Sequence, residues 1–220
     1  MGYIGKQPTP VPLTASDVTD GIITSAKIAD GTITSDDLAS GVGGNLVKLS
    51  SSTASNSASI TFDNSVITST YKYYQIHCID IVIATDADNL KFQISTDNGS
   101  SYITSIYHLL LQASDTGTTS NAIESRYATA ETAIPIFGVV GGLGNAGNEV
   151  GNSIVHLLNP NSVKAKLFRV DGTYLNNNGE LQQQDVHSMY NTTTAYNNVK
   201  IACTSGNITS GTFILYGVTA

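Results

Sequence analysis

Aliphatic residues recur at every fifth position between residues 13 and 38. This ladder consists of Leu13, Val18, Ile23, Ile28, Ile33 and Leu38, separated mostly by Ser, Thr, Asp, Ala and Gly. Five helical steps rotate a side chain by about 500°, and five steps along a strand reverse its face, so neither element gathers the ladder on one side. The segment is therefore predicted to turn repeatedly.

The ladder belongs to three ten-residue units, VPLTASDVTD, GIITSAKIAD and GTITSDDLAS, which end in Asp20-Gly21, Asp30-Gly31 and Ser40-Gly41. Each unit has two ladder residues, too few to offset the entropy of ordering it, so the segment needs partner chains. Heptad spacing is absent, which predicts a short intertwined stalk of extended segments in a homo-oligomer rather than a coiled coil. A right-angled pentapeptide coil is the alternative, although the segment is too short to complete much of such a solenoid.

Beyond Gly44 the pattern changes to short alternating strands. Residues 73–83 give the clearest one, and its apolar face changes between Cys78 and Ile79, which predicts either a bulge or a strand that becomes buried on both faces. Asn98-Gly99 predicts a tight hairpin with a strand restarting at Tyr102. The Ser-rich run 50–59 is expected to lead into the first strand. The other predicted strands are 60–62, 90–95, 106–111, 134–140, 154–158, 164–170, 199–203 and 212–218. About nine short strands predict an all-β sandwich or jelly-roll-like head.

The composition supports one main domain. The chain has 220 residues, 40% hydrophobic and 12% charged, a balance typical of strands joined by polar turns. Residues 1–12 hold three of the five prolines, which oppose a helix and favour an extended segment, with a disordered tail as the alternative. We therefore divide the chain into an extended segment (1–12), a repeat stalk (13–43) and a β head (44–220).

Charge and cysteine content narrow the functional classes. The formal net charge is −7 and Lys and Arg do not cluster, which argues against a nucleic-acid surface. No apolar run approaches the ~20 residues of a membrane span, and membrane insertion is not expected. Cys78 and Cys203 have no disulfide or metal spacing, so both are predicted to be small buried hydrophobic residues.

No motif predicts catalysis, a cofactor or a metal. Gly142-Leu-Gly144-Asn-Ala-Gly147 matches GxGxxG, but no helix can follow it, and a flexible loop is expected instead. The four histidines lack metal-ligand spacing. Carboxylates that could cleave a glycan exist, but the sequence brings no two of them together; they are Glu124, Glu131, Glu149, Asp171, Glu180 and Asp185.

Tyrosines in polar, loop-rich stretches are the candidates for receptor contact. Exposed tyrosines beside Asn and Gln suit carbohydrate or protein recognition. Tyrosines half-buried at strand ends are the alternative. The candidates are Tyr102, Tyr107, Tyr127, Tyr174 and Tyr190.

Several phrases resemble tailed-bacteriophage tail-fibre and virion-appendage proteins. The ending SGNITSGTFILYGV (205–218) resembles their SGN…SGTF.LYG ending, and similar phrases stand at 69–76, at 90–100 and at Leu158-Asn-Pro160. The ITSAKIAD-type units look like those of phage fibre shafts and necks. The resemblance covers most of the chain.

The resemblance implies a homotrimer on a virion, on the tail in preference to the capsid surface. It implies an amino-terminal segment, Gly2, Tyr3, Ile4, Gly5 and Lys6, that docks onto another virion protein such as a tail adaptor or capsid protein. The β head would contact a host-surface glycan or protein. A short, non-enzymatic tail fibre or spike is the leading hypothesis. The alternatives are a capsid decoration or cement protein and, third, a glycan-cleaving tailspike enzyme.

Overall fold

The structure is a computed structural model that describes residues 14, 17–18, 20–29, 31–33, 37–38, 45–115, 121–138 and 141–218. For residues 112–115, 121, 122 and 124 it describes the backbone alone. The chain divides into two units, residues 1–43 and residues 44–220. Each is described by itself below.

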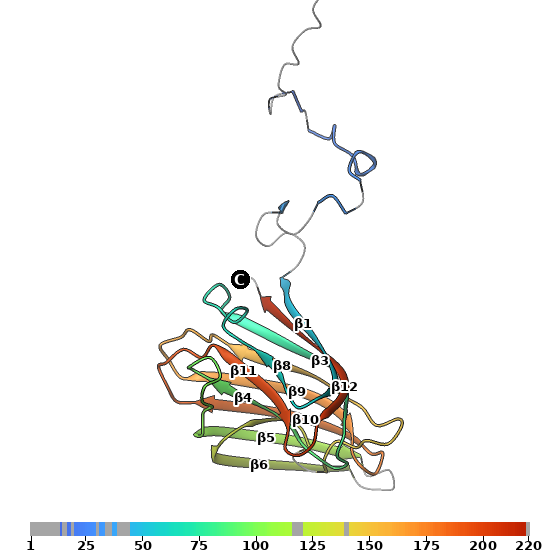
Figure 1. Cartoon of the computed structure of the whole chain (residues 1–220), viewed down its shortest axis with the longest axis vertical. Coiled ribbons are helices and arrows are strands. Elements are labelled where there is room, and N and C mark those ends of the chain that lie inside the picture. Colours follow the sequence, from blue (N-terminus) through green and yellow to red (C-terminus); the bar gives the residue numbers. More distant parts are fainter. Residues whose placement is uncertain are drawn as a thin grey trace, which may run out of the picture. The chain divides into compact units, whose positions relative to one another are not determined.

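The second unit is all-β, as the sequence predicts, with its strands in two antiparallel sheets (Figure 1). The larger sheet has the order β1-β12-β3-β8-β9-β10-β5-β6, and the smaller has the order β2-β11-β4-β7. The bounds are β1 Leu46–Ser57, β2 Ile60–Phe62, β3 Tyr73–Ile83, β4 Leu90–Ser95, β5 Ile106–Asp115, β6 Asn121–Glu131, β7 Ile134–Phe137, β8 Gly151–Leu158, β9 Lys166–Leu175, β10 Leu181–Tyr190, β11 Asn198–Cys203 and β12 Ile208–Val218.

Eight of these strands have the connectivity of a jelly roll. The order β1-β12-β3-β8 in one sheet faces β2-β11-β4-β7 in the other, and the chain passes repeatedly from one sheet to the other. Two hairpins are inserted into this framework, β5–β6 between β4 and β7, and β9–β10 between β8 and β11. Both extend the larger sheet past β8, so that it has twice as many strands as the smaller one.

The core lies between the sheets and is built by alternation. In β9 every second residue from Lys166 to Tyr174 is buried, and in β3 Tyr74, Ile76 and Cys78 are buried. Phe92 of the smaller sheet meets Phe168 of the larger sheet edge to face, with ring centroids 5.9 Å apart. Such a two-sided core allows this unit to bury its own apolar surface.

The bulge predicted in residues 73–83 is confirmed. The register with β8 shifts between Cys78 and Ile81, and Asp80 has φ +54°. The Asp80 amide donates a hydrogen bond to Asn152 Oδ1 at 2.9 Å. Past the bulge, Ile81 and Ile83 face the core again, so one extra residue restores the apolar alternation.

Three expectations about strands need correction. Asn98 and Gly99 have positive φ as predicted, and the Ile103 amide donates to the Ile94 carbonyl at 3.1 Å, but no strand restarts at Tyr102, because β7 takes the place beside the first half of β4. The first strand is β1, which includes most of the Ser-rich run. Two strands that the sequence did not predict, β6 and β10, complete the larger sheet.

In the first unit several of the described residues lie in turns. Gly21 and Gly31 both have positive φ, +78° and +79°. The Lys27 amide donates to the Thr24 carbonyl at 2.9 Å, and ten residues earlier the Asp17 amide donates to the Thr14 carbonyl at 3.0 Å. The ladder side chains within the described part are 38–56% exposed in the single chain; they are Val18, Ile23, Ile28, Ile33 and Leu38.

Candidate functional site

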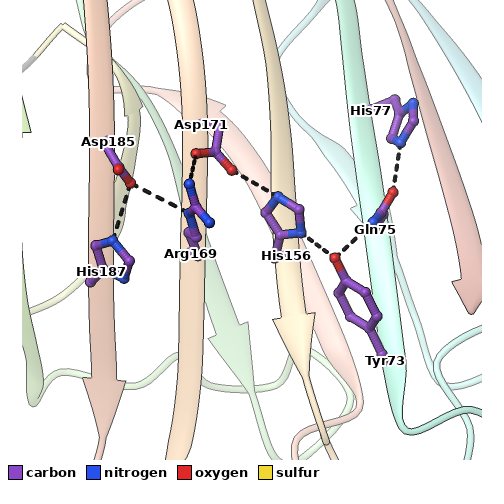
Figure 2. Close-up of polar contacts among 8 residues, drawn as sticks. All are labelled: Tyr73, Gln75, His77, His156, Arg169, Asp171, Asp185 and His187. Carbon is purple, nitrogen blue, oxygen red and sulfur yellow. Dashed lines mark hydrogen bonds and ion pairs between the residues drawn. The ribbon is translucent and has the colours of Figure 1, made fainter.

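The outer face of the larger sheet carries a continuous row of polar side chains at its centre, which we call the polar ladder. Cross-strand pairing places these residues side by side on four neighbouring strands, β3, β8, β9 and β10. Figure 2 shows their contacts. The polar ladder consists of Tyr73, Gln75 and His77 of β3, His156 of β8, Arg169 and Asp171 of β9, and Asp185 and His187 of β10.

One half of the polar ladder is a chain of hydrogen bonds with a single direction. His77 Nε2 donates to Gln75 Oε1 at 3.0 Å, and Gln75 Nε2 donates to the Tyr73 hydroxyl at 2.7 Å. The Tyr73 hydroxyl donates to His156 Nδ1, and His156 Nε2 donates to Asp171 Oδ2 at 2.9 Å. Because the carboxylate can only accept, this order assigns the His156 ring proton to Nε2.

In the other half of the polar ladder, Arg169 contacts both carboxylates. Its Nη2 donates to Asp171 Oδ1 at 2.6 Å, and its Nε lies 3.6 Å from Asp185 Oδ1. His187 Nε2 lies 3.3 Å from the same Asp185 oxygen. Asp171 and Asp185 are directly opposite each other on β9 and β10, so the guanidinium between them offsets the repulsion of two neighbouring carboxylates.

The surroundings of His77, at one end of the polar ladder, disfavour its charged form. Burial lowers the pKa of His77, and repulsion from His156 lowers it further. Its ring packs on Tyr216 of β12, with centroids 4.8 Å apart. A protonated His77 would still donate to Gln75 Oε1, so the direction of hydrogen bonding is the same in both protonation states.

A hollow of about 340 Å³ lies beside the polar ladder. Its lining includes His77 and Asp171 of the polar ladder. It also includes Asn152, Thr173 and Gln183, from β8, β9 and β10. Thr173 and Gln183 are exposed and lie directly opposite each other. The hollow therefore offers hydroxyl, amide, imidazole and carboxylate groups on a rigid sheet, a lining suited to a ligand with many hydroxyl groups.

The surroundings of Asp171 and Asp185 do not favour glycan cleavage by this pair. Of the carboxylates considered from the sequence, Asp171 and Asp185 are brought together. Cleavage by a carboxylate pair needs contrasting surroundings, one for an acid and one for a base or nucleophile. Both carboxylates instead contact Arg169, which gives them similar surroundings. Among the residues that the structure describes, no three His, Cys, Asp or Glu side chains could hold a metal ion.

The tyrosines expected to contact a receptor lie in different environments. Tyr107 and Tyr127 are 46% and 77% exposed on the outer face of β5 and β6. Tyr102 packs under Lys200, whose Nζ lies 4.4 Å from the ring centroid, and Tyr190 is half-buried against the core. Tyr174 was wrongly predicted: it is 1% exposed, and its hydroxyl donates to the Gly141 carbonyl. The alternation of β9 turns Tyr174 inward.

The glycine-rich motif is a loop, as predicted, but it is pinned rather than flexible. Leu143 is fully buried, and its amide donates to the Asp88 carbonyl at 2.9 Å. The Gly144 amide donates to the Leu175 carbonyl at 3.0 Å. A Cβ on Gly142 would overlap the backbone of Ala87, so glycine is required here for close packing.

The predictions for the amino-terminal segment fall largely outside the described residues. This applies to the attachment residues Gly2, Tyr3, Ile4, Gly5 and Lys6 and to Leu13 of the oligomerisation ladder.

Cys78 and Cys203 are free thiols, with Cys78 buried and Cys203 partly buried. Burial raises the pKa of each to about 12.

Sequence reasoning missed the polar ladder as a site. Arg169 follows His156 by 13 residues and His187 follows Arg169 by 18, and strand register alone brings the three together. The usable signal was a polar residue at alternate positions of otherwise apolar strands. Recognising it required the strand at 181–190, whose inward face carries buried Gln182 and Gln184 and therefore lacks an apolar pattern.

Comparisons with models of known protein families, with curated proteins and with solved structures found no match. No helix within the described ranges is long and apolar enough to span a membrane.

Proposed function

We propose that this protein is a non-enzymatic structural protein of a tailed-phage virion, a short tail fibre or spike. In this proposal it forms a homotrimer, attaches through its amino-terminal segment and presents the jelly-roll head to the host surface. One observation carries the proposal: a ten-residue repeat with an exposed aliphatic ladder precedes a β head with its own closed core. The sequence resemblance to phage fibres supports the same assignment.

The repeat supports association between identical chains. Its described ladder residues remain 38–56% exposed in the single chain. Isolated turns with so few apolar contacts are not stable alone, and identical chains present the same ladder at the same spacing. Three such segments wound together would cover their ladders mutually, which makes the segment a stalk in the proposed trimer.

The polar ladder and its hollow are the proposed ligand-binding face of the head. The hollow lies on strands fixed on both sides by neighbouring strands, and three groups of its lining, His77, Asn152 and Asp171, are held in place by the hydrogen bonds described above. A chain with a net charge of −7 favours a neutral ligand over a strongly anionic one. We therefore propose a neutral, hydroxyl-rich ligand, of the kind a bacterial surface glycan provides.

Deletion of the head in the phage tests the proposed role. Particles carrying the chain truncated after residue 43 should assemble and remain intact but lose adsorption to the host. Normal adsorption of such particles would contradict the proposal. Particles that adsorb but whose capsids become fragile would instead identify a decoration protein that stabilises the shell.

Substitution at the hollow tests the ligand face. The double variant Thr173→Ala with Gln183→Ala removes two exposed polar groups and leaves the hydrogen bonds of the polar ladder in place. We expect it to reduce binding of the purified chain to host cells or to their isolated surface glycan. Ser51→Ala is the matched control, because Ser51 is exposed on β1, away from the hollow on the same sheet. Equal binding by both variants would exclude the hollow as the ligand face.

A further inference from the structure

An apolar patch covers the outer face of the inserted hairpins. Its large side chains are 36–77% exposed, although inward-facing neighbours on the same strands, such as Ile106, Leu110 and Phe168, are buried. Their register makes the patch continuous, because Leu109 pairs with Tyr127 and Tyr107 pairs with Met189. The patch consists of Tyr107, Leu109 and Leu111 of β5, Ile123 and Tyr127 of β6, Leu167 of β9 and Met189 of β10.

The patch is apolar, although it lies on the water-facing side of the sheet. An antiparallel sheet with one face in water normally carries polar residues on that face, as the polar ladder does here. Most of the exposed apolar side chains instead lie on β5, β6, β9 and β10, the strands added to the jelly-roll framework, and Leu158 of β8, which is 37% exposed and pairs with Leu167, adjoins them. Part of the patch is hollowed, with a volume of about 500 Å³ lined by Tyr107, Leu109, Tyr127, Leu167 and Met189 among others.

We propose that this patch binds a second copy of the chain, as the contact between heads in the oligomer. The proposal rests on the homo-oligomer inferred above and assigns the surface that the heads use. It reassigns Tyr107 and Tyr127 from receptor contact to self-association.

The exposed area fits a subunit interface. Tyr107 and Tyr127 alone expose roughly 200–300 Å², taking about 150–250 Å² for a whole tyrosine side chain, and the five aliphatic side chains add more than the two tyrosines do. The total exceeds the few hundred Å² of apolar patch that a monomer usually exposes. It approaches the ~800 Å² per partner of a standard interface.

The composition of the patch agrees with this occupant. None of its seven side chains is charged, which is typical of the core of an interface between identical subunits. Charged and polar groups begin at its border, where His187 of the polar ladder pairs with Leu109 across the strands. In a chain with a net charge of −7, an uncharged contact surface lets copies approach without bringing like charges together.

The repeat makes this occupant more favourable than an unrelated protein. Chains joined at the repeat hold their heads at an effective concentration in the millimolar range, so a modest contact between heads would form. The repeat and the patch are separate apolar surfaces of one chain, and both remain uncovered in the single copy. Association of identical chains would cover both the repeat and the patch.

Hydroxyl-radical footprinting of the full chain tests the assignment at a concentration where light scattering gives the native mass. In an oligomer, Tyr127 should be oxidised several-fold more slowly in the wild type than in Leu109→Glu. Val163, which is 72% exposed in a turn outside the patch, should react equally in both. Val163→Glu is the control for adding a charge, and it should leave Tyr127 protected.

Each outcome separates this inference from the proposed function. An oligomer in which Tyr127 is as reactive as in Leu109→Glu overturns the patch assignment and leaves the oligomer intact. A monomer with reactive Tyr127 overturns both. Protection that occurs only on the virion means that another protein covers the patch, which overturns self-association. If Leu109→Glu loses its native circular dichroism, Tyr107→Ser replaces it, because this change adds no charge.

Discussion

Replacing Tyr73 by phenylalanine tests the proposed order of hydrogen bonds in the polar ladder. The hydroxyl joins the two halves of the hydrogen-bond chain, since it accepts from Gln75 at 2.7 Å and donates to His156. Tyr73→Phe keeps the ring and removes both bonds. A net hydrogen bond contributes about 0.5–1.5 kcal/mol, and water can reach this half-buried face to replace part of the loss. We therefore expect the free energy of unfolding to fall by about 1–2 kcal/mol.

Urea unfolding at fixed protein concentration measures this loss, and thermal unfolding should show a decrease in Tm of roughly 2–8 °C. Nitrogen NMR of the histidine rings provides an independent readout, because His156 Nδ1 loses its donor while Nε2 keeps its bond to Asp171. The matched control is Tyr216→Phe, a tyrosine on the neighbouring strand β12 whose ring packs on His77. Unchanged stability together with unchanged His156 resonances would refute the assigned hydrogen-bond order.

Three further predictions concern the head. Leu143→Ala should lower the free energy of unfolding by about 2–5 kcal/mol in urea titrations, because Leu143 is fully buried in the pinned loop; a loss below about 1 kcal/mol would mean that the loop is not packed. Hydrogen bonds from Ser101 and Ser95 lower the pKa of Asp97 from 3.8 to about 2. The ionised Asp97 therefore stabilises the fold fully above pH 3.8, and this stabilisation is lost as the pH falls towards 2. The free energies of unfolding of the wild type and of Asp97→Asn should converge over that interval, and a constant difference would contradict the pKa shift. With its pKa raised to about 12 by burial, Cys78 should resist iodoacetamide at about pH 8 in the folded chain and react after unfolding, as followed by mass spectrometry.

The sequence predicted the fold where one face of a strand is apolar. Residues 73–83 were recognised with their bulge, because Tyr74, Ile76 and Cys78 alternate with polar neighbours. The same rule failed for β10, whose inward face carries Gln182 and Gln184, and for β1, where serines predominate. In those strands the neighbouring strands, rather than local pattern, determine the structure.

The candidate site was less predictable for a related reason. The contact between His156 and Asp171 depends on the pairing of β8 with β9, and the contact between Arg169 and Asp185 depends on the pairing of β9 with β10. A shift of one residue in either register would turn these side chains to the opposite face. Tyr174 shows the reverse error, since its sequence surroundings are polar while strand alternation buries it.

The central claim is that identical chains associate through the repeat and through the apolar patch of the head. The most direct test is the native mass of the full chain, measured by light scattering behind a sizing column, beside that of a chain beginning at residue 44. We expect a trimer for the full chain and weaker, concentration-dependent association for the shorter one. A monomeric full chain at every concentration would contradict the central claim.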